Sequence, residues 1–276
     1  MSQSSEPFHL LRLPGELRNA VCRFALSTND GLYHCKDAFG KRILCASPSG
    51  FLDFNQLKYA SRQLYQETAG LELHCNTLIF PDRPLRTGPS VGLKNFLSFQ
   101  HGMTPYWRGM IRTVIIQHNF DCPVGVNKTC ICYQVQMSDL IKFSTTHQKA
   151  TVYFEVKLDA RDGIHFIGKA SMVYEALRGS EVPGLCYYSN LLCRFAEVAD
   201  WASIPEKIRR SYGTSRHLPC NIILLPHGQL DEESFRECIL RWSISQPNDP
   251  NKGSFEEVGG VEACVSLARK WYAEGI

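Results

Sequence analysis

The sequence predicts an α/β or α+β protein whose helices and strands alternate and whose strands form a mixed, partly parallel sheet. Short apolar stretches at 77–80, 112–117, 151–156 and 221–225 are continuous, as in strands covered on at least one face. Helical patterns separate them. With 276 residues, 44% apolar and 21% charged, the chain can bury a substantial core and is not disordered as a whole.

The first helix starts at a Leu-Pro pair. Pro14 suits the first helical turn, where its missing N–H costs nothing, and Glu16 suits the positive end of the helix dipole. Helical spacing puts four apolar residues on one face: Leu13, Leu17, Val21 and Phe24. We expect a helix of about three turns that ends at the polar stretch after Leu26.

A hairpin and a second helix follow. Two short apolar stretches, 32–35 and 42–46, flank a turn between Lys36 and Lys41 and predict a small hairpin. The next helix is expected over 55–74, with a buried stripe at Leu57, Ala60, Leu64, Thr68 and Leu71. The strand 77–80 precedes a Pro/Gly/Ser-rich loop that reaches Gly92, which suggests an N-terminal region 1–90 and an α/β region 91–276, or one continuous domain.

Helices and strands alternate in the rest of the chain. Helices are expected at 93–100, 137–144, 164–178, 191–211, 232–243 and 261–273, and a surface loop at 248–253. Each of the three strands in this region follows a helical segment. The pattern favours a sheet with helices packed on it.

The opening of the chain resembles a known group of proteins. Leu13-Pro14-Gly15-Glu16-Leu17-Arg18, followed by the helix 57–69 and the strand 76–80, is similar to a large filamentous-fungal family with an F-box-like N-terminal element. An F-box is a short trio of helices whose Leu-Pro start docks on the adaptor subunit of a cullin ubiquitin ligase. A hairpin-like stretch separates the first two helices here, which departs from that trio.

The resemblance implies a role. It makes the chain a non-enzymatic protein-interaction protein, such as the substrate-recognition subunit of a cullin ubiquitin ligase. The implied partner-binding surface consists of Leu13, Pro14, Leu17, Val21 and Phe24. The region after residue 90 would then select substrates.

Another interpretation of the same residues stays open. The stripe of the first helix could be buried against the helix 55–74 of the same domain, with Glu16, Arg18, Arg62 and Glu67 as an ion-pair seam of small energetic value. The chain would then be a structural family domain without adaptor binding.

Four soft metal ligands lie close together in the sequence at His118, Cys122, Cys130 and Cys132. They could hold a tetrahedral zinc ion. The spacing lacks a Cys-x2-Cys pair, however, and a cysteine-bearing loop is the default interpretation. We therefore expect no cofactor, with zinc as the alternative.

A second alternative site lies near His227, which follows the strand 221–225. Ligands gather at the carboxyl ends of strands in α/β sheets. An enzymatic or metal-binding α/β domain is thus the rival function. Against it, the sequence has no Gly-x-Ser-x-Gly elbow and no phosphate-binding glycine motif.

Charge and hydropathy exclude several partners. The net charge is only +3, and a dedicated nucleic-acid binder usually carries a larger, clustered excess. No apolar run is long enough to cross a bilayer, and the polar N-terminus is not a signal peptide. We expect a cytoplasmic or nuclear protein without nucleic-acid or membrane partners. Its 12 cysteines are expected to be mostly reduced core residues.

Overall fold

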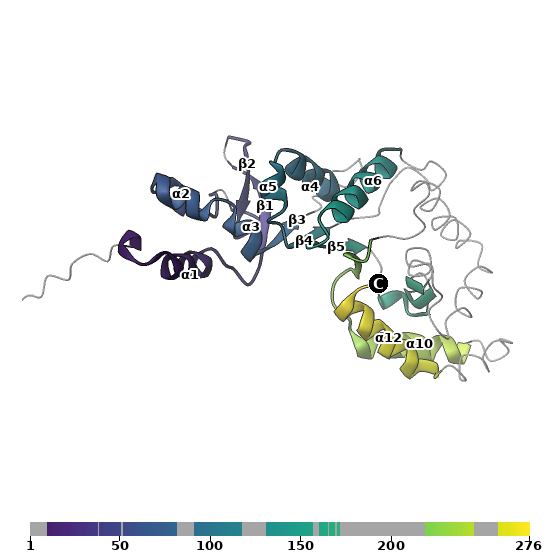
Figure 1. Ribbon diagram of the computed structural model, residues 1–276. Coiled ribbons are helices and arrows are strands. Elements are labelled where there is room, and N and C mark those ends of the chain that lie inside the picture. The colour runs from purple at the N-terminus through teal and green to yellow at the C-terminus, as the bar shows by residue number, and fades with distance from the viewer. Residues whose placement is uncertain are drawn as a thin grey trace, which may run out of the picture. The chain divides into compact units, whose positions relative to one another are not determined.

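The computed structural model, shown in Figure 1, describes the chain in several stretches. They divide into two compact units: the first comprises residues up to 79 together with 102–114, and the second comprises 80–101 and the residues from 115 onward. The described residues are 10–37, 39–50, 52–81, 91–117, 131–156, 160–164, 166–168, 170–171, 219–245 and 259–276.

Six strands form one mixed sheet in the order β2-β1-β3-β4-β5-β6. β1 (Leu32–Lys36) runs antiparallel to β2 (Arg42–Cys45) and parallel to β3 (Thr77–Phe80). β5 (Thr151–Val156) runs parallel to β6 (Ile222–Pro226), and β4 is Thr113–Gln117. The predicted α/β class with a mixed, partly parallel sheet is confirmed.

The first unit contains several short helices besides the hairpin. They are η1 (Leu10–Arg12), α1 (Gly15–Ala25), η2 (Leu57–Tyr59), α2 (Arg62–Thr68), α3 (Leu71–Cys75) and α5 (Pro105–Arg108). Cys22 and Leu26 of the α1 segment are buried, as are Leu64, Leu73 and Leu78. The predicted first helix, hairpin and strand 77–80 are present.

The predicted continuous helix 55–74 is wrong. It is divided into η2, α2 and α3, and the last break falls at Gly70, whose φ is +79°. The indole ring of Trp107 occupies the space that a Cβ atom on residue 70 would need. A side chain at this position would therefore meet both backbone strain and the tryptophan ring.

The second unit packs its helices around aromatic side chains. α4 (Val91–His101) and α6 (Ile131–Thr146) contact each other, and the ring of Phe96 lies 5.2 Å from Phe80 and 5.0 Å from Phe143. α10 (Glu232–Ser245) and α12 (Gly260–Glu274) also pack together, where Phe235 and Trp271 both contact Phe166. These two clusters of rings provide much of the buried apolar volume.

Several predicted elements lie outside the described residues: the helix 191–211, the loop 248–253 and the later part of the helix 164–178. The start of the predicted helix 164–178 is described. It follows the short η3 (Ala160–Asp162), and its residues Ile164, Phe166 and Ile167 are buried. Within the described stretches, no helix combines the length and the apolar character needed to span a membrane.

Candidate interaction surface

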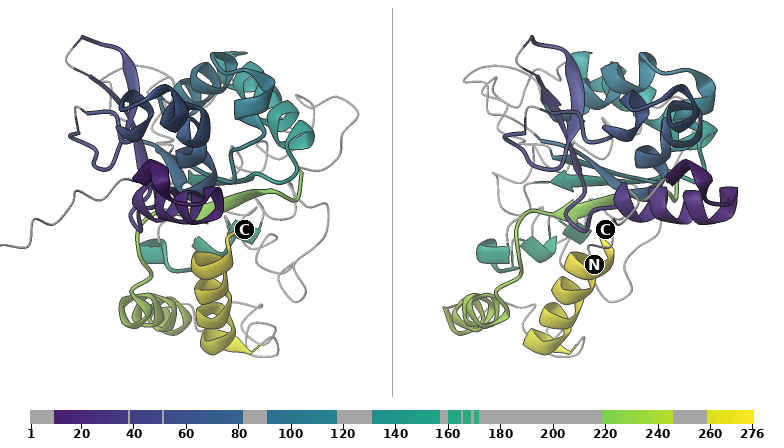
Figure 2. Two further views of the ribbon diagram at one scale, coloured as in Figure 1. Left: turned by 60° about the vertical axis from the view of Figure 1, so that its left-hand side comes forward. Right: turned by 90° about the vertical axis from the view of Figure 1, so that its left-hand side faces the viewer.

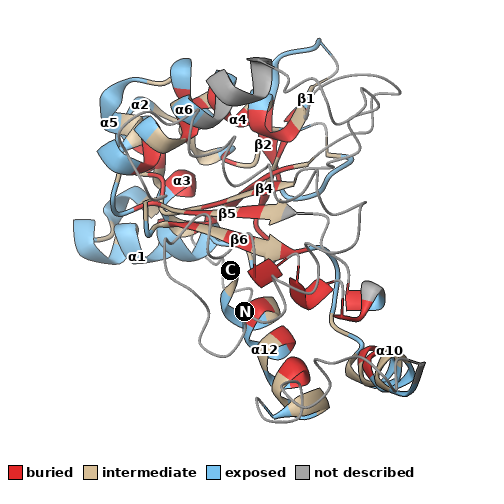
Figure 3. Ribbon diagram, turned by 90° about the vertical axis from the view of Figure 1, so that its right-hand side faces the viewer, coloured by how far each residue is buried: buried red, intermediate tan, exposed pale blue. Residues whose placement is uncertain are grey.

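The predicted apolar stripe of α1 faces outward. Leu17 is 54%, Val21 42% and Phe24 87% exposed, whereas Cys22 and the following Leu26 are buried. Pro14 is exposed and Leu13 is half-buried. Figure 3 shows α1 almost entirely in the colour of exposed residues. An amphipathic helix normally buries its apolar stripe, whereas in α1 the apolar stripe is exposed together with Glu16, Asn19 and Arg23.

One of the two charged residues of the Leu-Pro motif, Arg18, faces inward, whereas Glu16 is exposed. The guanidinium of Arg18 donates from Nε to Glu67 Oε2 at 2.9 Å and from Nη2 to Glu67 Oε1 at 2.7 Å. Its Nη1 donates to the carbonyl of Leu13 at 2.6 Å and to that of Leu11 at 3.3 Å. Arg18 thereby fixes both the turn before α1 and the angle of α1 against α2.

The remaining residues of the predicted ion-pair seam behave differently. Hydrogen bonds from Arg18 and then from Gln63 hold the pKa of Glu67 below its usual value. Among the described residues, neither Glu16 nor Arg62 forms an ion pair. The seam is therefore a single forked contact rather than a network of four charges.

Asn76 fixes the other end of α1. Its side chain is buried; Nδ2 donates to the carbonyls of Leu26 at 2.6 Å and Glu72 at 2.9 Å. Its Oδ1 accepts from the backbone N–H of Thr28 at 2.7 Å. One amide thus satisfies backbone groups at the end of α1, at the end of α3 and in the connection to β1. The sequence pattern assigned no role to this residue.

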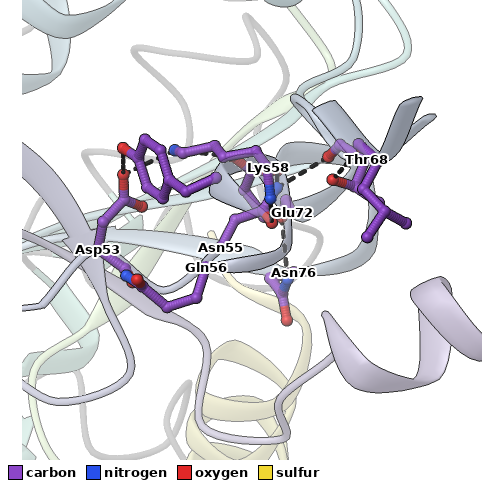
Figure 4. A network of polar contacts seen from close by, with 9 residues as sticks. Asp53, Asn55, Gln56, Lys58, Thr68, Glu72 and Asn76 are labelled. Carbon is purple, nitrogen blue, oxygen red and sulfur yellow. Dashed lines mark hydrogen bonds and ion pairs between the residues drawn. The ribbon is translucent and has the colours of Figure 1, made fainter. Parts of the chain in front are cut away.

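A buried polar network, drawn in Figure 4, holds the segment before η2 against α2 and α3. Asn55 Nδ2 donates to Glu72 Oε2 and to the carbonyl of Thr68, both at 2.8 Å. Lys58 Nζ lies 2.6 Å from Asp53 Oδ2 and 3.9 Å from Glu72 Oε1. Burial raises the pKa of Glu72, although hydrogen bonds from its own backbone and from Asn55 act against that rise.

The segment before η2 is also held by the hairpin. The backbone N–H of Phe54 donates to the carbonyl of Leu44 at 2.7 Å, which ties the same segment to β2. All residues of the network belong to the first unit. The arrangement is that of a structural clamp, because its polar atoms are directed at one another and buried together.

The alternative metal site falls on a part of the chain that the structure does not describe. His118, Cys122 and Cys130 lie outside the described residues, as does the side chain of Cys132. Within the described ranges, no three His, Cys, Asp or Glu side chains gather in a group that could hold a metal ion. The zinc alternative therefore stays a prediction.

The alternative site near His227 has a defined geometry. His227 follows β6 directly, and its Nδ1 lies 2.7 Å from Oε1 of Glu155 on the parallel neighbour β5. The His227 side chain is 63% exposed. The Tyr272 hydroxyl donates to the His227 carbonyl at 3.4 Å and accepts from the N–H of Ala160 at 3.2 Å. The pair lies at the carboxyl ends of two parallel strands.

Comparisons of the chain with protein-family models, with curated proteins and with solved structures give no match.

Proposed function

We propose that this chain is a non-enzymatic protein-interaction protein that binds its partner through the outer face of α1, made of Leu13, Pro14, Leu17, Val21 and Phe24. The observation that carries the proposal is the exposed apolar stripe of α1, which the contact of Arg18 with Glu67 on the other side of the helix holds outward. Fully burying an apolar side chain of this size contributes about 1.5–3 kcal/mol. A partner that covers Phe24 and its neighbours would gain that free energy.

The cullin-ligase adaptor is the partner that we propose. The Leu-Pro motif resembles the docking element of an F-box, and the exposed stripe supplies the apolar surface that such docking requires. The hairpin β1–β2 between α1 and α2 departs from a three-helix F-box. We therefore place the proposed contact on α1 and the turn before it, rather than on a complete F-box.

The experiment is affinity capture of the tagged full-length protein from a filamentous-fungal host. A Leu17→Asn/Phe24→Ser variant changes only the outer face, and exposed substitutions of this kind usually alter stability by no more than about 0.5 kcal/mol. Leu13 and Pro14 are poorer targets, because substitution there can change the backbone conformation of the turn, whose carbonyls at Leu13 and Pro14 accept from Arg18 at 2.6 Å and 3.0 Å. Ile244→Ser, which changes an exposed residue of α10, is the matched control.

We expect the adaptor to be recovered with the native protein and with Ile244→Ser but not with the α1 variant. Proteins that co-purify independently of α1 would be candidate substrates. Absence of the adaptor from the native sample would remove the ligase role and leave a structural family domain. Equal recovery with all three proteins would place docking elsewhere on the chain.

The second candidate is a catalytic or metal-binding role near His227, favoured by the 2.7 Å contact between His227 and Glu155. The carboxylate could orient the imidazole and leave its other nitrogen available to a ligand. If this role is correct, purified protein should retain zinc or another divalent metal that His227→Ala loses. Substoichiometric metal that is equal in both proteins would contradict this role.

A further inference from the structure

Asp37 bonds to the described residues that follow it in the turn between β1 and β2. Its Oδ1 accepts from the backbone N–H groups of Phe39 at 2.9 Å and Lys41 at 2.8 Å. The backbone adds hydrogen bonds from Asp37 to Lys41 and from Gly40 to Asp37, and Gly40 has a φ of +78°. Figure 2 shows this turn at the projecting end of the hairpin in both views. The tip is therefore preorganised.

Phe39 lies at the apex of this rigid turn and is 96% exposed. A phenylalanine gains nothing for folding in such a position, because its ring stays in water. Because hydrogen bonds hold the backbone that carries the ring, less backbone entropy is lost on association. The sequence pattern treated Phe39 as an ordinary turn residue, although an aromatic side chain among turn-formers and lysines is itself a signal.

Three exposed cations lie directly behind the ring. Lys36 and Arg42 are register partners across the two strands, and Lys41 follows the turn. Like charges directly opposite each other destabilise a strand pair. In the stretches that the structure describes, none of the three forms an ion pair with an acidic side chain. The hairpin thus keeps a repulsive pair that folding does not need.

The positive charges at the tip also act on His34, a buried residue of β1. Burial, followed by the charges of Arg42 and then Lys36, lowers the pKa of His34 to about 4. An anion bound at the tip would relieve the repulsion between Lys36 and Arg42. Asp37 supplies one negative charge in the turn, and the remaining positive charge is available to an anionic ligand.

We propose that the hairpin tip, defined as Lys36, Phe39, Lys41 and Arg42, is a docking site for the anionic surface of a phospholipid bilayer. The order of groups along the hairpin matches the layers of a membrane: the ring at the apex enters the interface, and the cations behind it meet the head groups. A nucleic-acid site would need a groove with several stacking rings, whereas the tip carries one. This inference is independent of docking through α1.

The proposal departs from the sequence-based expectation of no membrane partner. That expectation rested on the lack of a segment long enough to cross a bilayer. A hairpin tip binds at the surface and needs no such segment. The association is expected to be weak and salt-sensitive, because three cations and one ring supply it.

The experiment is co-sedimentation of the full-length protein with vesicles of phosphatidylcholine alone and of phosphatidylcholine mixed with phosphatidylserine. We expect binding to the mixed vesicles only, with weakening as salt is added. Arg42→Gln should reduce the apparent affinity about fivefold, since each cation near the surface contributes about 1 kcal/mol. Phe39→Ser should reduce it about tenfold.

Two matched controls separate this site from others. Lys270→Gln removes an exposed charge from α12, and Phe24→Ser removes the comparably exposed ring of α1. Both should bind mixed vesicles like the native protein, whereas Phe39→Ser should keep the partner captured through α1. If the test of one proposed site gives a negative result, the result for the other site can still be interpreted.

Three results would overturn the proposal. The first is no difference between the two kinds of vesicle for the native protein. The second is binding that Phe39→Ser and Arg42→Gln leave unchanged. The third is binding of the tip to oligodeoxythymidine or polyglutamate, with no binding to mixed vesicles, which would assign the surface to nucleic acid or to an acidic protein.

Discussion

Asn76→Ala should destabilise the protein by about 2–4 kcal/mol. The substitution removes a buried amide that bonds the carbonyls of Leu26 and Glu72 and the N–H of Thr28. Each buried backbone group left without a partner costs about 1–3 kcal/mol, and water can reach the half-exposed Thr28. Denaturant unfolding followed by circular dichroism measures the loss. The first unit, which contains all of these groups, should unfold at lower denaturant.

Two further variants separate the hydrogen bonds from the loss of atoms. Asn76→Asp keeps an acceptor for Thr28 but loses the donor to Leu26 and Glu72, so it should be destabilising as well. Asn19→Ala changes an exposed asparagine within α1 and should leave stability within about 0.5 kcal/mol of the native value. Equal stability of Asn76→Ala and Asn19→Ala would mean that Asn76 does not fix the end of α1.

Acid should destabilise the protein as the pH falls below about 6.5, because His34 is buried in its neutral form. Burial, and then the charges of Arg42 and Lys36, lower the pKa of His34 from 6.5 to about 4. Between these two values the unfolded chain binds a proton that the folded chain does not, so stability falls as pH decreases. The difference of about 2.5 in pKa, at about 1.36 kcal/mol each, sets an upper limit of about 3 kcal/mol.

The free energy of unfolding measured from pH 7 to pH 4.5 tests this effect. Carboxylates with lowered pKa values, such as Glu67 and Glu232, lose their contribution only at lower pH. Glu72 acts in the opposite direction, because its raised pKa means that protonation stabilises the folded state. The variant His34→Leu should lack most of the decline in this range. A native-like decline in that variant would attribute the effect to other groups.

The fold could be predicted where local pattern and burial agree. The strands 77–80 and 151–156 have the predicted bounds, and α1 and the hairpin lie where Pro14 and the turn after Lys36 indicate. The prediction of one continuous helix over 55–74 was wrong because the apolar spacing of that segment continues through Gly70. That glycine has a positive φ, and Trp107, which is distant in sequence and contributed no local signal, fills the space that a Cβ atom there would need.

The candidate site was predicted in composition but not in orientation. Spacing placed Leu17, Val21 and Phe24 on one face, yet it could not decide whether that face is buried or exposed. The orientation of α1 is set by its opposite face, where Arg18 bonds to Glu67 and Cys22 is buried. Such pairings between residues far apart in the sequence are fixed by the tertiary structure. The same limit applies to Asn76 and to the contact of His227 with Glu155.

The most direct test of the account is a binding isotherm between the purified protein and the purified fungal cullin-ligase adaptor. Native protein, Phe24→Ser and Ile244→Ser would be compared after thermal melting has shown that all three are folded. If the outer face of α1 is the docking surface, native protein and Ile244→Ser should bind alike, and Phe24→Ser should bind at least about tenfold more weakly. Failure of the native protein to bind, or equal binding by Phe24→Ser, would contradict the account.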